Sequence, residues 1–83
     1  MSFKGLTANS LAYIQQLVRN GDFTECGLAR FLGLSQPHMH NVLNGIRPVT
    51  PEVFDLILER FGMDVLDFYP RADVERYLRG SGP

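Results

Sequence analysis

The stretch that decides the fold is TECGLARFLGLSQPHMHNVLNGIRP, residues 24–48. It contains two short runs of apolar residues at helical spacing, and a favoured N-cap residue, threonine or serine, precedes each run. Gly33 can end the first run in the left-handed conformation, which costs glycine little. The two runs are separated by Gly33, Leu34 and Ser35 alone. The stretch therefore predicts helices over about residues 24–32 and 36–44, joined by a tight turn.

The same kinds of signal predict helices on both sides of this pair. Thr50-Pro51-Glu52 combines a cap, a proline at the first helical position and a carboxylate near the positive end of the helix dipole. Asp64 can cap another short helix, and no segment alternates apolar and polar residues as a β-strand does. We therefore expect an all-α domain. The flanking helices are predicted over about residues 8–20, 51–61 and 65–69, with a short C-terminal helix over about 72–79.

Chain length and cysteine content exclude several classes of protein. The 83 residues form one small domain, and a domain of this size buries roughly 60–65% of its unfolded surface. Little room is left for an enclosed pocket, so we expect no small-molecule substrate. One cysteine cannot form an internal disulfide or a cysteine-rich zinc site. Because no apolar run approaches the ~18–20 residues of a membrane span, a soluble protein in a reducing compartment is expected.

Charge is unevenly distributed along the chain. The formal net charge is −1, from 8 lysines and arginines against 9 aspartates and glutamates. The interval between Glu25 and Glu52 has no acidic residue, but it contains Arg30, His38, His40 and Arg47. The central third is therefore locally basic within a slightly acidic chain. A basic patch is the usual feature of a protein that binds nucleic acid.

The helix predicted over about residues 36–44 has one buried face and one exposed face. At ~100° per residue, the apolar side chains of this helix fall within one arc, and so does that of Ile46, the next apolar residue after the helix. The arc contains Met39, Val42, Leu43 and Ile46. The opposite arc contains Pro37, His40, Asn41 and Asn44. Amide side chains can pair with the N6 and N7 edge of adenine, and apolar side chains can contact the thymine methyl group. The exposed face therefore suits a helix that lies in the major groove of DNA.

This arrangement resembles the DNA-binding domains of the lambda-repressor and Cro-like proteins, the XRE family. The resemblance covers about residues 7–69 and depends on a set of residues in order: Thr24, Leu28-Ala29, Leu32-Gly33-Leu34-Ser35, Met39, Val42, Asn44-Gly45, Arg47 and Gly62-Met63-Asp64-Val65-Leu66. It implies a five-helix domain with a helix-turn-helix. It also implies a repressor-like transcriptional regulator of a bacterium or phage, located in the cytoplasm at the nucleoid, with double-stranded DNA as its partner.

The resemblance assigns roles to individual residues. Those at the positions that contact bases are Gln36, Pro37, His40 and Asn41, with Ser35 at the N-terminal edge. Those that fall where the family contacts phosphate are Thr24, Asn44 and Arg47. Glu25 departs from the pattern, because it stands where glutamine is common and its carboxylate would repel a nearby phosphate.

Metal binding and catalysis have little support in the sequence. His38 and His40 are two residues apart, so on a helix they point ~200° apart and cannot share one ion with Cys26. We expect partial packing for His38, no metal and no cofactor. The carboxylates of Glu52, Asp55 and Glu59 lie along one helix and are interpreted as its solvated face. Because no nucleophile and base form a recognisable pair, the chain is not expected to be an enzyme.

The C-terminal segment is a candidate for dimerisation. Val74, Tyr77 and Leu78 form a short apolar stripe that needs cover, either from the body of the domain or from a second copy of the chain. We expect a homodimer, followed by a flexible tail over residues 80–83. Two alternatives remain open: a protein-interaction or dimerisation module that no longer binds DNA, and the antitoxin of a toxin–antitoxin pair.

Overall fold

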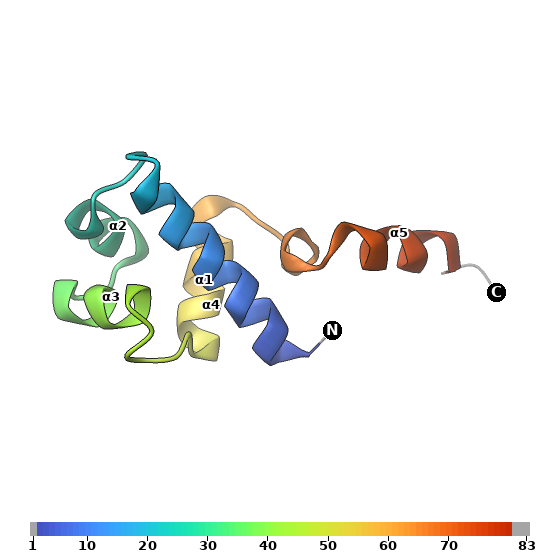
Figure 1. Ribbon diagram of the computed structural model, residues 1–83, viewed down its shortest axis with the longest axis horizontal. Helices are drawn as coiled ribbons and strands as arrows, with labels where there is room; N and C mark the ends of the chain where they lie inside the picture. Colours follow the sequence, from blue (N-terminus) through green and yellow to red (C-terminus); the bar gives the residue numbers. More distant parts are fainter. Residues whose placement is uncertain (1, 81–83) are drawn as a thin grey trace.

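A computed structural model describes residues 2–80 of the chain (Figure 1). Within this range the chain forms five α-helices and one 3₁₀-helix, and it contains no strand. The elements in order are α1 (Phe3–Arg19), α2 (Glu25–Leu32), α3 (Gln36–Leu43), α4 (Pro51–Phe61), η1 (Val65–Phe68) and α5 (Arg71–Gly80). The all-α class is confirmed, and a helical element is present at each of the predicted places.

The helix termini follow the capping signals in the sequence. The hydroxyl of Thr24 accepts a hydrogen bond from the Gly27 N–H at 2.9 Å, and that of Ser35 accepts one from the His38 N–H at 3.2 Å. Gly33 ends α2 with φ +75°. Asp64 caps η1 in a reciprocal capping box with Asp67. These bonds satisfy backbone groups that a helix end otherwise leaves without a partner.

The first helix begins earlier than predicted, at Phe3 and not at about residue 8. The hydroxyl of Ser2 accepts a hydrogen bond from the Gly5 N–H at 3.2 Å and caps the helix. Gly5 lowers the intrinsic helix propensity of this turn, which hides the start of the helix in the sequence. Tertiary contacts outweigh that cost, because Leu6 is buried and the ring of Phe3 packs edge-on against Phe54.

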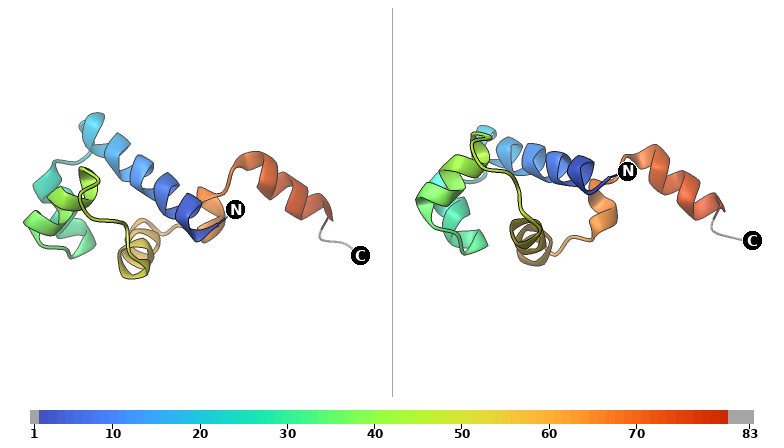
Figure 2. Two further views of the ribbon diagram at one scale, coloured as in Figure 1. Left: turned by 60° about the horizontal axis from the view of Figure 1, so that its bottom comes forward. Right: turned by 90° about the horizontal axis from the view of Figure 1, so that it is seen from below.

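The core lies between α1, α2, α3 and α4 (Figure 2). Ala29 is buried on α2, the helix that packs against α3. The side-chain amide of Gln15 on α1 donates a hydrogen bond to the carbonyl of Leu43 at 2.8 Å and so attaches the end of α3 to α1. The buried apolar residues are Leu6, Ile14, Leu28, Ala29, Leu32, Met39, Val42, Val49, Val53, Phe54, Ile57 and Phe68.

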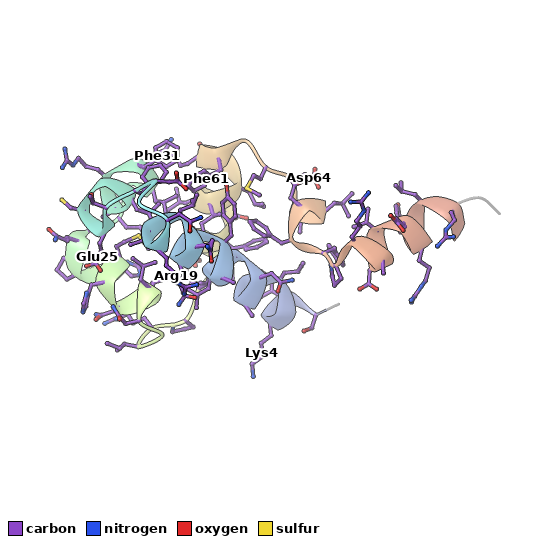
Figure 3. All side chains as sticks on the ribbon, turned by 45° about the horizontal axis from the view of Figure 1, so that its top comes forward. Lys4, Arg19, Glu25, Phe31, Phe61 and Asp64 are labelled. Atoms are coloured by element: carbon purple, nitrogen blue, oxygen red, sulfur yellow. The ribbon has the colours of Figure 1, made fainter. Side chains whose placement is uncertain are left out.

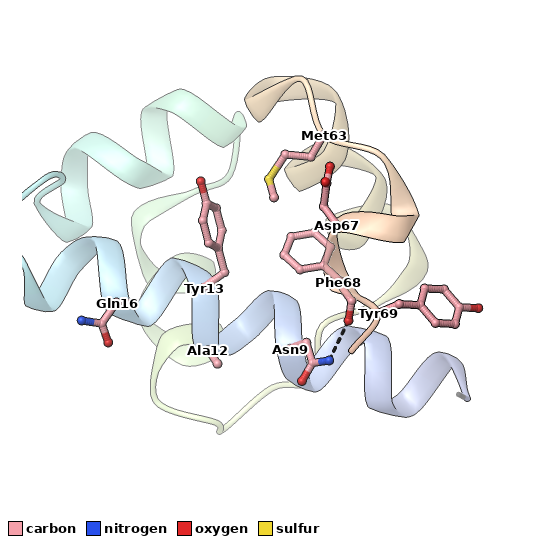
Figure 4. A pocket seen from close by; sticks show the side chains of 8 residues that line it. All are labelled: Asn9, Ala12, Tyr13, Gln16, Met63, Asp67, Phe68 and Tyr69. Atoms are coloured by element: carbon pink, nitrogen blue, oxygen red, sulfur yellow. Dashed lines mark hydrogen bonds between the residues drawn. The ribbon is translucent and has the colours of Figure 1, made fainter. Parts of the chain in front are cut away.

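Aromatic rings connect the core to η1. The ring of Tyr13 contacts both Phe61 and Phe68, at centroid distances of 5.5 and 5.8 Å. Phe54 and Phe68 are buried, whereas Phe61 and Tyr69 are partly buried, so all four rings belong to the core or pack against it. Asn9 on α1 donates a hydrogen bond to the carbonyl of Phe68 at 2.6 Å, beside a groove between α1 and η1 (Figure 4).

Helix α5 extends away from the body formed by α1–α4 (Figures 1 and 2). It contains no buried residue, and Tyr77 and Leu78 are each 64% exposed. The body of the domain therefore does not cover the part of the apolar stripe formed by Tyr77 and Leu78. Gly80 is the last residue of α5 and not part of a tail. The other residues of the predicted tail, 81–83, lie outside the described residues.

Candidate functional site

The candidate site is the exposed face of α3 together with the start of α2. Met39 and Val42 are 0% exposed and hold α3 against the core. The opposite face of the helix carries exposed Gln36, Pro37 and His40, and Asn41 is half-buried beside them. The division of this helix into a buried face and an exposed polar face is therefore confirmed. His38 is half-buried, as predicted from its place at the edge of the buried arc.

Ile46 is a correction to the predicted buried arc, since its side chain is 67% exposed. Helix α3 ends at Leu43, and the chain then turns at Gly45 with φ +73°. The N–H groups of Ile46 and Arg47 both donate to the carbonyl of Asn41, at 2.8 and 3.1 Å. The helical period of ~100° per residue does not extend past the turn, so extrapolating the helix to Ile46 placed it on the wrong side.

Four predicted base-contacting residues lie together. Gln36, Pro37, His40 and Asn41 line a surface hollow of about 350 Å³, and Glu25 of α2 forms its other wall. Ser35 is exposed at the N-terminal edge of α3, where its hydroxyl serves as the helix cap. The hollow is open to solvent and offers amide, imidazole and carboxylate groups to a ligand.

The three predicted phosphate-contacting residues lie around this hollow and do not form one cluster. Thr24 is exposed at the start of α2, beside the backbone N–H groups of the first turn. Asn44 is the C-cap of α3, and its side-chain amide donates to the carbonyl of His40 at 2.7 Å. Arg47 is exposed in the turn after α3 and has no ion-pair partner within residues 2–80.

A hydrogen-bonded pair of Glu25 and His40 is the feature that sequence reasoning missed. His40 Nδ1 lies 3.0 Å from Oε1 and 3.3 Å from Oε2 of Glu25 (Figure 3 labels Glu25). The side chain of His40 is 56% exposed and that of Glu25 is 32% exposed. A pair with this much access to solvent contributes about 0–1 kcal/mol to stability. The two residues are far apart in sequence, on different helices, so no helical spacing could predict the contact. Its consequence is geometric: it fixes the orientation of the imidazole.

Other charged and thiol groups surround the pair. Arg19, at the end of α1, lines an adjacent hollow together with Glu25 and Asn44. Arg30 donates to the sulfur of Cys26 at 3.6 Å, and Cys26 is an exposed free thiol.

Among residues 2–80, histidine, cysteine and carboxylate side chains do not gather in groups of three or more that could hold a metal ion. In the same range, each helix is too short or too polar to cross a membrane.

Comparison with known proteins identifies no relative of the chain. It matches no family model, no curated protein and no solved structure. The geometry of α2 and α3 is therefore the basis for assigning a function.

Proposed function

We propose that this protein binds double-stranded DNA sequence-specifically through a helix-turn-helix formed by α2 and α3, as a repressor-like transcriptional regulator of the XRE type. One observation carries the proposal. Met39 and Val42 fix α3 from behind, while its opposite face offers amide and imidazole groups in one open hollow. The major groove of B-DNA is wide enough to admit an α-helix, and base edges there form distinct donor and acceptor patterns.

Base recognition is assigned to the N-terminal half of α3. The amides of Gln36 and Asn41 can each form two hydrogen bonds with the N6 and N7 edge of adenine. Pro37 is exposed next to them and can contact a thymine methyl group. Ser35 caps the helix and lies where the first turn of α3 would approach the bases. His40 completes the hollow.

Phosphate contacts are assigned to the rim of the same face. The first turn of α2, after Thr24, presents backbone N–H groups at the positive end of a helix dipole, which favours an anion. Arg47 supplies an exposed cation after α3, and Asn44 supplies an amide at its C-terminus. These groups position the protein on the duplex but carry no sequence information.

A homodimer through α5 is part of the proposal, because one monomer contacts only a few base pairs. Helix-turn-helix proteins usually extend the contacted sequence by binding as a dimer to two half-sites one helical turn apart. On α5, Tyr77 and Leu78 are each 64% exposed and Val74 is half-buried. Asp73 lies near the start of the helix and Arg76 and Arg79 toward its end, while Arg71 pairs with Glu75 within the same chain. Antiparallel pairing of two copies would place Asp73 of one copy near the arginines of the other.

A second candidate, from another class, is a protein-interaction module that has lost DNA binding. The observation that favours it is Glu25, a carboxylate at the N-terminus of α2, where the first proposal places a phosphate. The net charge of −1 also favours this candidate, because proteins that bind nucleic acid usually carry a basic patch. Such a module would not bind a duplex even at low ionic strength, so the two candidates differ in one measurable property.

Selection of binding sites from random duplexes at low ionic strength tests the proposal. Enrichment of a defined sequence supports it, and no retention of any duplex contradicts it. In the enriched site, Gln36→Ala and Asn41→Ala should each relax preference at one position, by about 1–3 kcal/mol for a bidentate contact. Arg47→Ala should weaken binding to all sequences alike. Lys4→Ala is the control, since this exposed cation lies at the start of α1, away from α2 and α3 (Figure 3).

A further inference from the structure

We infer that Glu25 is a positioning residue that fixes the proton of His40 on Nδ1, so that Nε2 accepts a hydrogen bond from the exocyclic amino group of adenine or cytosine. This inference rests on the proposed DNA binding and names the base chemistry that one corner of the site selects. It arises from the contact between α2 and α3, which brings a carboxylate of one helix to the imidazole of the other.

The argument starts from the donor and acceptor capacity of the two groups. An ionised carboxylate can only accept hydrogen bonds, and a neutral imidazole has one donor and one acceptor nitrogen. His40 Nδ1 lies 3.0 Å from Glu25 Oε1, so Nδ1 carries the proton and donates it to the carboxylate. Nε2 of the neutral ring is then the acceptor. The side-chain amide of Asn44 lies 3.4 Å from Nδ1, but it donates to the backbone carbonyl of His40 at 2.7 Å, so the carboxylate is the closer partner of Nδ1.

The resulting corner is an acceptor surface. Its hollow is lined by His40 and Glu25 on facing helices, and both Nε2 and the carboxylate oxygens accept hydrogen bonds. In the major groove, adenine and cytosine present amino donors, whereas guanine O6 and N7 and thymine O4 are acceptors. An adenine or cytosine amino group therefore complements the corner, and an acceptor at the same place would face an unpaired lone pair.

Protonation of the imidazole should reverse this preference. A charged imidazole donates from both nitrogens, so Nε2 would then favour the acceptors of guanine and thymine. Glu25 on α2 is the charged group in contact with His40, and Arg19 at the end of α1 lines an adjacent hollow together with Glu25 and Asn44. His38 lies on α3 itself, but its side chain points ~200° away from that of His40.

The first test measures base discrimination. The base pair that His40 contacts is identified as the position at which His40→Ala loses preference in the selected site. All four bases are then placed there, and affinities are measured by fluorescence anisotropy near pH 8. The wild-type protein should prefer the amino-bearing base by about tenfold.

Glu25→Gln separates positioning from charge. The amide can donate to or accept from Nδ1, so the tautomer is no longer fixed and discrimination should fall to about twofold or less, whereas overall affinity rises because a negative charge is removed. Glu59→Gln removes a carboxylate of the same charge from α4, at a more exposed position (71% against 32% for Glu25), and should leave discrimination unchanged. Higher affinity with unchanged discrimination in Glu25→Gln would overturn the inference and leave the proposed function intact. Absence of any duplex binding would overturn both.

A second test needs no DNA. The ¹⁵N chemical shifts of the imidazole nitrogens distinguish the two neutral tautomers, and His38 serves as an internal reference within the same helix. The free wild-type protein should have His40 protonated on Nδ1 above pH 8, and Glu25→Gln should move the population toward the Nε2–H form. A ring protonated on Nε2 in the wild-type protein would overturn the inference.

Discussion

The substitution Met39→Ala tests whether α3 is held from behind as described. Met39 is 0% exposed and packs in the core with Val42 on the buried side of α3. Truncating a buried methionine removes its transfer free energy and leaves a cavity, at a cost of 2–5 kcal/mol in typical cores. Because α3 is short, with two fully buried side chains, we expect a loss of about 3 kcal/mol in the free energy of unfolding.

Urea denaturation followed by circular dichroism measures this loss. A slope of about 1–3 kcal/mol per molar urea is usual for small domains, so the midpoint should fall by about 1–3 M with little change in slope. Gln36→Ala is the matched control on the exposed face of the same helix and should change stability by less than about 0.5 kcal/mol. Equal losses for the two variants, or a larger loss for Gln36→Ala, would refute the assignment of the two faces.

Three further predictions concern other parts of the fold. Gly33→Ala should lower the free energy of unfolding by about 1–2 kcal/mol, because φ is +75° at this position, although the added Cβ would meet no atom closer than 3.9 Å. Thermal or urea unfolding measures this loss, and unchanged stability would contradict the left-handed turn. Asn9→Ala should cost about 1 kcal/mol through the lost bond to the Phe68 carbonyl, measured in the same way against exposed Ala12→Ser. In sedimentation at high micromolar concentration, the wild-type chain should be a dimer and Tyr77→Glu a monomer, with the unfolding midpoint of α1–α4 unchanged. A monomeric wild-type chain would refute the dimer.

Much of the fold could be predicted from local signals. Thr24, Ser35 and Asp64 are capping residues whose effect is confined to one turn, and Gly33 requires a backbone conformation that glycine adopts cheaply. Such signals are legible without tertiary information. The start of α1 was predicted wrongly because Gly5 weakens the local signal, and the burial of Leu6 that compensates for it depends on contacts with the folded core.

The candidate site was predictable in part for the same reason. Gln36, Pro37, His40 and Asn41 share one face of a regular helix, so their spacing alone brings them together. Ile46 was placed wrongly because the helix ends at Leu43 and its period no longer applies. The pair of Glu25 and His40 depends on how α2 and α3 pack together, which no local pattern encodes.

Binding to a selected duplex as a function of salt concentration tests the central claim most directly. If α3 enters the major groove while about three phosphates contact each subunit, log K should fall linearly with log salt, with a slope near −2.7 per subunit. In the same titration, Arg47→Ala should reduce the slope by about 0.9. Absence of duplex binding at low ionic strength, or a binding constant that does not change with salt, would contradict the account.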